Sequence, residues 1–373
     1  MKLILAASLF LLSGCASLFG DRLTEEQQIQ VQVQRASEEA EILNAEKVLE
    51  KGRYEEAGIL FRDFQGRRSQ SVFYQSARLG EAQSLEGLGR YQEAADLYRD
   101  IYLKTLKHQP EIAALALYRM SFAYEALGDD LKTVAALLDA KRIGEHLPVE
   151  VAQAEIPARL AAVYGRQGRD AEAIAYLNDA EKGITKVMAE KGPQVKADWL
   201  AKTYVQMGSV STNQLSADNF SEFVQGQKWV QVYLIKAMRL NDSTWSPRAQ
   251  TKLQETYRDL YTQVESAKTR EVQNRLGGDL FDLMDQADLY RPIAGQKMNS
   301  YEQAFFVYLS EVRKKTEKQI YGSGETMSLT EESQKLNSLK RSGRVKADSL
   351  LPEEKKPSIP LPPKVVPEED PNL

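Results

Sequence analysis

The chain has one cysteine, Cys15, which follows an apolar run near the N-terminus. Met1 and Lys2 begin the chain, and residues 3–12 are apolar except for Ser8. Such a run has the size of a signal-peptide core, because a membrane-spanning helix needs about 20 apolar residues. A thiolate is a strong nucleophile, so a cysteine placed here can carry a lipid as a thioether. With a single cysteine, no disulfide can form within the chain.

The four residues Leu12-Ser13-Gly14-Cys15 resemble the lipobox of bacterial lipoproteins. The resemblance implies a diacylglyceryl group on the Cys15 sulfur, removal of residues 1–14 as a signal peptide, and acylation of the new amino group. Ala16 follows the cysteine. By resemblance to lipoprotein sorting, the absence of Asp there favours the bacterial outer membrane, with the protein facing the periplasm. The alternative is an ordinary signal peptide with a cysteine near the cleavage site by chance.

The net charge of the chain limits which classes of partner we expect. The formal charge is −4, and it becomes −5 when Lys2 leaves with the signal peptide. A nucleic-acid surface would need a basic excess, so we expect no nucleic acid among the partners. No second apolar run of about 20 residues occurs, so the N-terminal lipid is the expected attachment to the membrane.

Few residues have the types and spacing that catalysis needs. The histidines His108 and His146 lie near expected helix ends, and neither has a second His or a Cys at metal-ligand spacing. Glu265-Ser266 resembles the catalytic Glu-Ser pair of some lytic transglycosylases, but nothing downstream resembles the rest of that motif. Gly277-Gly278 is interpreted as a helix break rather than a phosphate cradle. The sequence therefore predicts no catalytic residue, no metal site and no cofactor.

A short motif recurs along the N-terminal half of the chain. Residues 52–57, Gly-Arg-Tyr-Glu-Glu-Ala, return as Gly-Arg-Tyr-Gln-Glu-Ala at 89–94 and as Gly-Arg-Asp-Ala-Glu-Ala at 168–173. Weaker copies include Gly128 and Gly208, and successive glycines are 37, 39, 40 and 40 residues apart. Each glycine stands between two helix-like segments, where it permits the positive φ that ends a helix sharply.

Other residues recur at fixed distances from these glycines. Two antiparallel helices approach closely only where side chains are small, so small residues seven before and five after each glycine predict helix crossings. These pairs are Ala45 and Ala57, Ala82 and Ala94, Ser121 and Thr133, and Ala161 and Ala173. An aromatic residue or leucine nine positions after the glycine is expected to fill the seam to the next repeat: Phe61, Tyr98, Leu137 and Leu177.

This pattern resembles the tetratricopeptide repeat over residues 36–210. The resemblance implies an all-α fold, a solenoid of helical hairpins whose concave face is lined mostly by the first helix of each pair. The family's usual period is about 34 residues, so each unit here has a longer second helix or loop. Arg78 and Pro157 stand where a bulky residue is usual early in the first helix. The alternative is a non-repeating helical bundle.

The flanks differ from the repeats. Residues 15–35 hold the lipidated cysteine and a polar, Gln-rich stalk that is expected to be helical. Residues 211–320 keep a helical period and are expected to form degenerate helical repeats that cap the solenoid. Residues 321–373 are rich in proline near their end and are expected to form a largely disordered tail.

The tetratricopeptide resemblance also predicts a partner groove. In that family the inner face carries the second, fifth, ninth and twelfth residues of each unit. Counted back from Gly89 and Gly128, residues at these places include Gln83, Glu86, Tyr118, Phe122 and Glu125. Tyr118 and Phe122 would then be two rings on a groove flanked by carboxylates. The alternative places Phe122 in the core.

A solenoid without catalytic chemistry usually works by binding. We therefore expect a lipid-anchored periplasmic adaptor or scaffold that holds other envelope proteins, in the assembly of an outer-membrane, secretion, pilus or motility complex. Two alternatives stay open: a cell-wall turnover enzyme, and a structural link between the outer membrane and peptidoglycan. Peptidoglycan is accordingly a further candidate partner.

Overall fold

The computed structural model describes residues 24–210, 215–216, 218–292 and 296–322, and these residues form an all-α fold. The leader, Cys15 and residues 323–373 of the proposed tail lie outside the described residues. Within the described ranges there is no strand. The α-helices are α1 (Glu25–Glu50), α2 (Tyr54–Arg67), α3 (Tyr74–Gly87), α4 (Tyr91–Thr105), α5 (Pro110–Ala126), α6 (Asp130–Arg142), α7 (Ile156–Arg166), α8 (Asp170–Lys191), α9 (Ala197–Met207), α10 (Phe220–Arg239), α11 (Trp245–Glu265), α12 (Arg270–Asp288) and α13 (Ser300–Tyr321). Short helical turns also occur, η1 (Gly144–His146), η2 (Val151–Glu155) and η3 (Gly192–Gln194).

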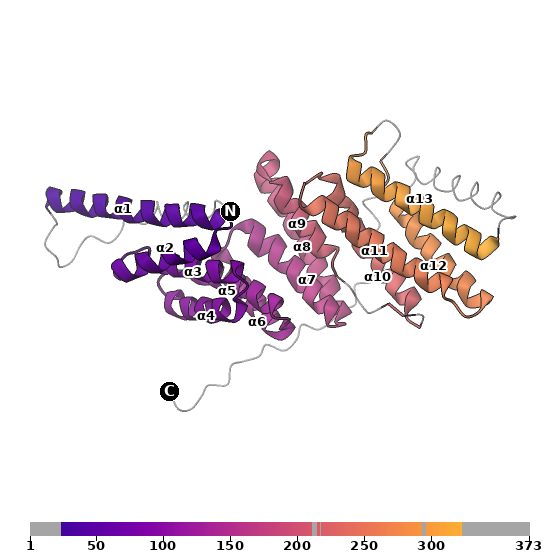
Figure 1. Ribbon diagram of the computed structural model, residues 1–373, viewed down its shortest axis with the longest axis horizontal. Helices are drawn as coiled ribbons and strands as arrows, with labels where there is room; N and C mark the ends of the chain where they lie inside the picture. The colour runs from indigo at the N-terminus through magenta and orange to yellow at the C-terminus, as the bar shows by residue number, and fades with distance from the viewer. Residues whose placement is uncertain (1–23, 211–214, 217, 293–295, 323–373) are drawn as a thin grey trace, which may run out of the picture.

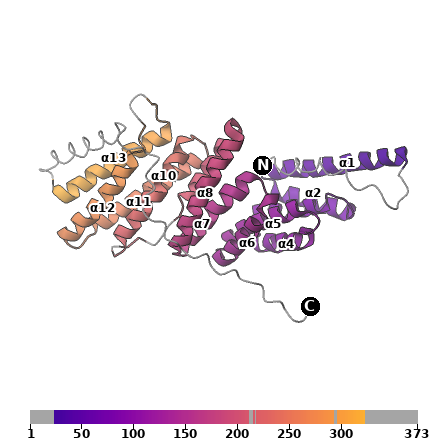
Figure 2. The ribbon, with the colours of Figure 1, turned by 180° about the vertical axis from the view of Figure 1, so that it is seen from behind.

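The helices stand side by side in a row. Figure 1 shows α1 to α6 at one end, α7 to α9 in the middle and α10 to α13 at the other end, and Figure 2 shows the same order from behind. Most helices pack mainly against their neighbours in the sequence, and α1 also touches α3, α3 touches α5 and α7 touches α9. The molecule is therefore elongated, with local contacts repeated along its length.

Glycines make four of the sharp turns between paired helices. Gly52, Gly89, Gly128 and Gly168 have φ between +69° and +76°, a conformation that a side chain would strain. The prediction of positive φ is confirmed at these four glycines and is wrong at Gly208, whose φ is −74°. Gly208 instead permits a close approach between α9 and α10, because a Cβ there would lie 2.4 Å from Leu234 Cγ.

The small residues expected at the helix crossings are all buried. Each member of the four pairs, from Ala45 and Ala57 to Ala161 and Ala173, is at most 2% exposed. The expected seam residues Phe61, Tyr98, Leu137 and Leu177 are buried as well. Phe61 packs so tightly on α3 that a Cβ at Gly80 would lie 2.3 Å from its ring. Large residues of one pair therefore fill space left by small residues on the next.

The C-terminal helices α10 to α13 surround a core of their own. Its members include Tyr257, Leu283, Phe305 and Phe306, which are at most 1% exposed. The helices expected from periodicity in residues 211–320 are present. The interpretation of Gly277-Gly278 as a helix break is wrong, because both residues lie inside α12. A Cβ at Gly277 would lie 1.9 Å from Ile320 Cδ1, so this glycine lets α12 and α13 approach.

The first half of α1 extends past the packed helices. Thr24 caps it with a capping box, in which its side chain accepts a hydrogen bond from the Gln27 backbone. Residues 24–34 are exposed, whereas Ile42, Val48 and Leu49 are buried against α2 and α3. The Gln-rich segment is thus helical from residue 25 onward, as predicted.

Candidate functional site

Side chains from the first helix of four successive pairs, α3, α5, α7 and α9, meet in one polar and aromatic group. We call this group the first-helix cluster. Its members are Glu86 on α3, Tyr118, Arg119, Phe122 and Glu125 on α5, Glu155 in η2, Arg159 on α7, and Trp199 and Lys202 on α9.

Phe122 is at the centre of the cluster and is partly exposed. The guanidinium carbon of Arg159 lies 3.6 Å from the centre of its ring. Arg119 lies 5.4 Å and Lys202 5.7 Å from the same point. Tyr118 meets the ring edge-on at 5.1 Å. A ring held between cations and a second ring has little freedom, so these contacts hold Phe122 in position.

Arg159 is a charged residue buried in an otherwise apolar helix. It is 2% exposed. It donates to Ser121 Oγ, and to Glu125 Oε2 at 2.6 Å, while its buried Nε has no hydrogen-bond partner among the described residues. Glu125 also accepts from Arg166 at 3.3 Å. A buried arginine needs such partners, because removing it from water is costly.

Glu155 is a buried carboxylate that joins three elements. It is 5% exposed and accepts from the Tyr118 hydroxyl on α5. It also accepts from Trp199 Nε1 and Lys202 Nζ on α9, each at 2.8 Å. Burial, together with the neighbouring Glu155 carboxylate, raises the pKa of Tyr118 well above its usual value. Glu155 therefore fixes the spacing of α5, η2 and α9.

Glu86 makes the equivalent connection between α3, α4 and α5. It accepts from the Tyr98 hydroxyl at 2.8 Å and from Arg119 at 2.9 Å. Burial raises the pKa of Tyr98, which therefore stays a neutral donor to the carboxylate at ordinary pH. The cluster as a whole is a chain of paired charges around one partly exposed ring.

The structure brings four of the five predicted groove residues into this cluster. Glu86, Phe122 and Glu125 keep some exposure, and Tyr118 and Gln83 are each only 6% exposed. The expectation that Tyr118 is an exposed ring is therefore wrong. The extra helical turn η2 precedes α7 and places Glu155 over the Tyr118 hydroxyl, which covers it. Gln83 is buried on α3 and has no hydrogen bond to these residues in the described structure.

Sequence reasoning missed Arg119, Glu155, Arg159, Trp199 and Lys202. Two of them, Glu155 and Lys202, stand at inner-face positions of the tetratricopeptide pattern and could have been predicted from it. Counted back from Gly168, Glu155 is the second residue of its unit, and counted back from Gly208, Lys202 is the ninth. Arg159 gave a different signal, a lone cation within the apolar stretch 156–165.

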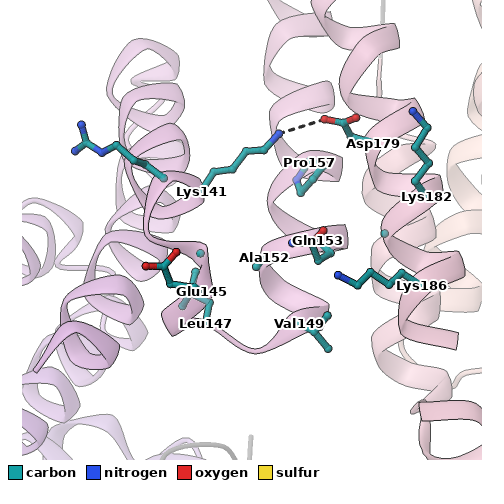
Figure 3. Close-up of a pocket in the computed structure, with 13 residues that line it drawn as sticks. Lys141, Glu145, Leu147, Val149, Ala152, Gln153, Pro157, Asp179, Lys182 and Lys186 are labelled. Carbon is teal, nitrogen blue, oxygen red and sulfur yellow. Dashed lines mark hydrogen bonds and ion pairs between the residues drawn. The ribbon is translucent and has the colours of Figure 1, made fainter. Parts of the chain in front are cut away.

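A separate cleft of about 680 Å³ lies between α6, the connection through η1 and η2, and α8. Figure 3 shows Lys141 reaching from α6 to Asp179 on α8, and Lys186 extending from α8 toward Gln153. The Lys141–Asp179 ion pair measures 3.2 Å. None of the residues that line the cleft is a member of the first-helix cluster.

His146 in η1 and Glu265 in α11 are not members of the first-helix cluster. His146 Nδ1 is 3.8 Å from Glu111 Oε1, and Glu265 is the last residue of α11. Among the described residues, no three His, Cys, Asp or Glu side chains are grouped as metal ligands would be. None of the helices in the described ranges is long and apolar enough to cross a bilayer.

The chain matches no protein-family model, and no curated protein matches it.

Proposed function

We propose that this protein is a lipid-anchored adaptor of the bacterial envelope, which binds partner proteins through the inner face of a tetratricopeptide-like solenoid. The observation that carries the proposal is the first-helix cluster, in which successive hairpins contribute side chains to one surface around a partly exposed ring. The partners are other envelope proteins, in the assembly of an outer-membrane, secretion, pilus or motility complex.

The solenoid assignment is supported by features that recur with the repeat. Four glycines with positive φ close four hairpins. The small residues at each crossing are buried, and a large residue from each pair fills the seam to the next. The intervals from Gly128 to Gly168 and from Gly168 to Gly208 exceed the usual tetratricopeptide period, because the connection between α6 and α7 contains η1 and η2 and because α8 is long. We expect this insertion to alter the pitch of the superhelix there.

The binding role is supported by the fixed position of Phe122. Interfaces draw most of their affinity from a few aromatic or arginine side chains, and ordering such side chains in advance lowers the entropic cost of binding. Phe122 is ordered by Arg159 and Tyr118, and Trp199 adds a second partly exposed aromatic side chain nearby. A partner side chain can pack on these rings while the surrounding charges set its orientation.

The membrane anchor is supported by the sequence around Cys15. The apolar run over residues 3–12 followed by Leu12-Ser13-Gly14-Cys15 is typical of a lipoprotein leader. Attachment at residue 15 leaves the α1 extension between the lipid and the row of helices, where it can serve as a spacer. The exposed residues 25–34 of α1 add about 15 Å to this spacer.

The proposal is tested by quantitative capture of partners from cells that express the lipidated full-length protein. Three forms are compared after mild crosslinking: wild type, Phe122→Ala, and the control Leu131→Ala, which alters a side chain that is 78% exposed on α6. We expect the same envelope proteins with wild type and control, and at least tenfold less of them with Phe122→Ala.

Stability is measured in parallel, because Phe122 also packs on Arg159. A fully buried Phe→Ala change costs about 3–5 kcal/mol, so we expect about 2 kcal/mol for this partly exposed ring. Phe122→Leu keeps much of the packing and removes the aromatic face, and it should also reduce capture. Undiminished capture by both Phe122 variants, with folding intact, would contradict the proposal.

A further inference from the structure

The cleft beside α8 exists because of the residues that lengthen the repeat. Helix α6 ends at Arg142, whereas α8 continues to Lys191, so its C-terminal half has no α6 beside it. The connection through η1 and η2 covers that half instead. Gly183 brings the two into backbone contact, since a Cβ there would lie 1.7 Å from the carbonyl oxygen of Gln153.

The charges in this cleft are unbalanced. Four cations and two carboxylates line it: Lys141, Arg142, Lys182 and Lys186, with Glu145 and Asp179. Lys141 pairs with Asp179 and Arg142 with Asp139. Among the described residues Lys182 has no ion pair or hydrogen bond, and Lys186 is 4.0 Å from Glu190 on its own helix. Two lysines on α8 are therefore available to an incoming anion.

The spacing of these two lysines fits one kind of ligand. Lys182 and Lys186 are four residues apart on a helix, which puts their Cβ atoms about 5–6 Å from each other. In an extended peptide, residues two apart point to the same side and are about 7 Å from each other. Two acidic residues separated by one other residue can therefore face both lysines at once.

The opposite side of the cleft suits the residue between them. In an extended peptide the middle side chain points away from its two neighbours. It would face the connection between α6 and α7, where Leu147, Val149 and Ala152 line the cleft. Val149 is partly exposed, so apolar surface is available there.

We propose that this cleft binds an acidic segment of a partner protein, in extended form, with an acidic–apolar–acidic pattern. The acidic side chains pair with Lys182 and Lys186, and the apolar side chain packs against Val149 and its neighbours. This second site does not depend on the adaptor role of the first-helix cluster or on the lipid anchor.

The test uses the purified full chain and a fluorescein-labelled peptide, Ala-Glu-Val-Glu-Val-Glu-Ala, with binding followed by fluorescence anisotropy at low salt. The variant Lys182→Gln/Lys186→Gln should bind about fivefold more weakly, because each exposed ion pair contributes modestly. The matched control is Lys47→Gln/Lys51→Gln, which removes the same charges at the same sequence spacing from exposed positions in the last turn of α1 and directly after it. We expect the control to retain wild-type affinity.

Two further comparisons separate this ligand from others. A peptide with Gln in place of Glu should not bind, and Val149→Glu should weaken binding by placing a carboxylate opposite the lysines. Equal affinities for the cleft variant and the control would overturn the proposal. Displacement of the peptide by inorganic phosphate far more effectively than by sodium chloride of equal ionic strength would also overturn it, since that result indicates a simple anion site.

Discussion

Replacing Gly183 with Ala tests how the connection between α6 and α7 packs on α8. The added Cβ would lie 1.7 Å from the carbonyl oxygen of Gln153 and 2.3 Å from its carbonyl carbon. Both atoms are backbone, so no side-chain rotation relieves the overlap. Overpacking typically costs about 1–3 kcal/mol, whereas replacing a helical glycine with alanine gains about 0.8–1.0 kcal/mol. We expect a net loss of up to about 2 kcal/mol.

The control for this change is Gly278→Ala in α12. Gly278 is also inside a helix, and a Cβ there meets no atom within 4 Å. Its expected effect is the helix-propensity gain alone, about 0.8–1.0 kcal/mol. The melting temperatures, followed by circular dichroism, should therefore move in opposite directions for the two variants, by about 1–2 °C per kcal/mol for a chain of this size. An equal stabilisation by both would refute the close contact between η2 and α8.

Three other changes test separate parts of the structure. Cys15→Ala should release the protein from the membrane fraction into the soluble periplasm, or leave it as an uncleaved precursor. Cell fractionation and mass spectrometry measure both outcomes, and unchanged membrane retention and mass would contradict the lipid anchor. Ala94→Leu should lower the free energy of unfolding by about 1–3 kcal/mol, because Ala94 is 0% exposed at a helix crossing. Ala162→Leu should lower it less, because Ala162 is 6% exposed. Equal melting temperatures for the two variants would argue against the crossing. Burial and the Glu50 carboxylate raise the pKa of Glu46, so its charge is disfavoured in the folded state. Glu46→Gln should accordingly stabilise the protein at pH 7, and this gain should disappear as the pH falls below the ordinary glutamate value of about 4.3; a gain that persists in acid would contradict this origin.

The hairpins could be predicted because their determinants are local. A glycine and two small residues within about a dozen positions specify one turn and one crossing, and the sequence contains both at Gly52, Gly89 and Gly168. The C-terminal helices could be predicted for the same reason, because the spacing of apolar residues along one helix does not depend on which helix packs against it.

The role of a glycine could not be predicted from the sequence where that role depends on a distant helix. Gly277 marks a close approach to Ile320, and Gly208 a close approach to Leu234. A single sequence shows the missing side chain in both cases, but not the helix that occupies the space. Gly208 does end α9, but without the positive φ that we expected, and the helix break expected at Gly277 does not occur.

The repeat frame predicted only part of the candidate site, because several of its contacts join distant segments of the chain. The repeat frame located Phe122 and Glu125 on the face of α5 that carries the first-helix cluster. Arg159 contacts both from a position more than 30 residues away, and its burial depends on Glu125 and Ser121 as partners. Pairings at that separation follow from how hairpins stack, which the spacing within one repeat does not specify.

The proposed role of the first-helix cluster in partner binding is tested most directly by photo-crosslinking in living cells. A photoreactive phenylalanine analogue is placed at Phe122 in one form of the full-length protein and at Leu131, on the exposed side of α6, in another. The proposal predicts that light joins the Phe122 form to a discrete set of envelope proteins and that the Leu131 form yields none of them. The same crosslinked proteins at both positions, or none at Phe122 while the lipidated protein is abundant and folded, would contradict it.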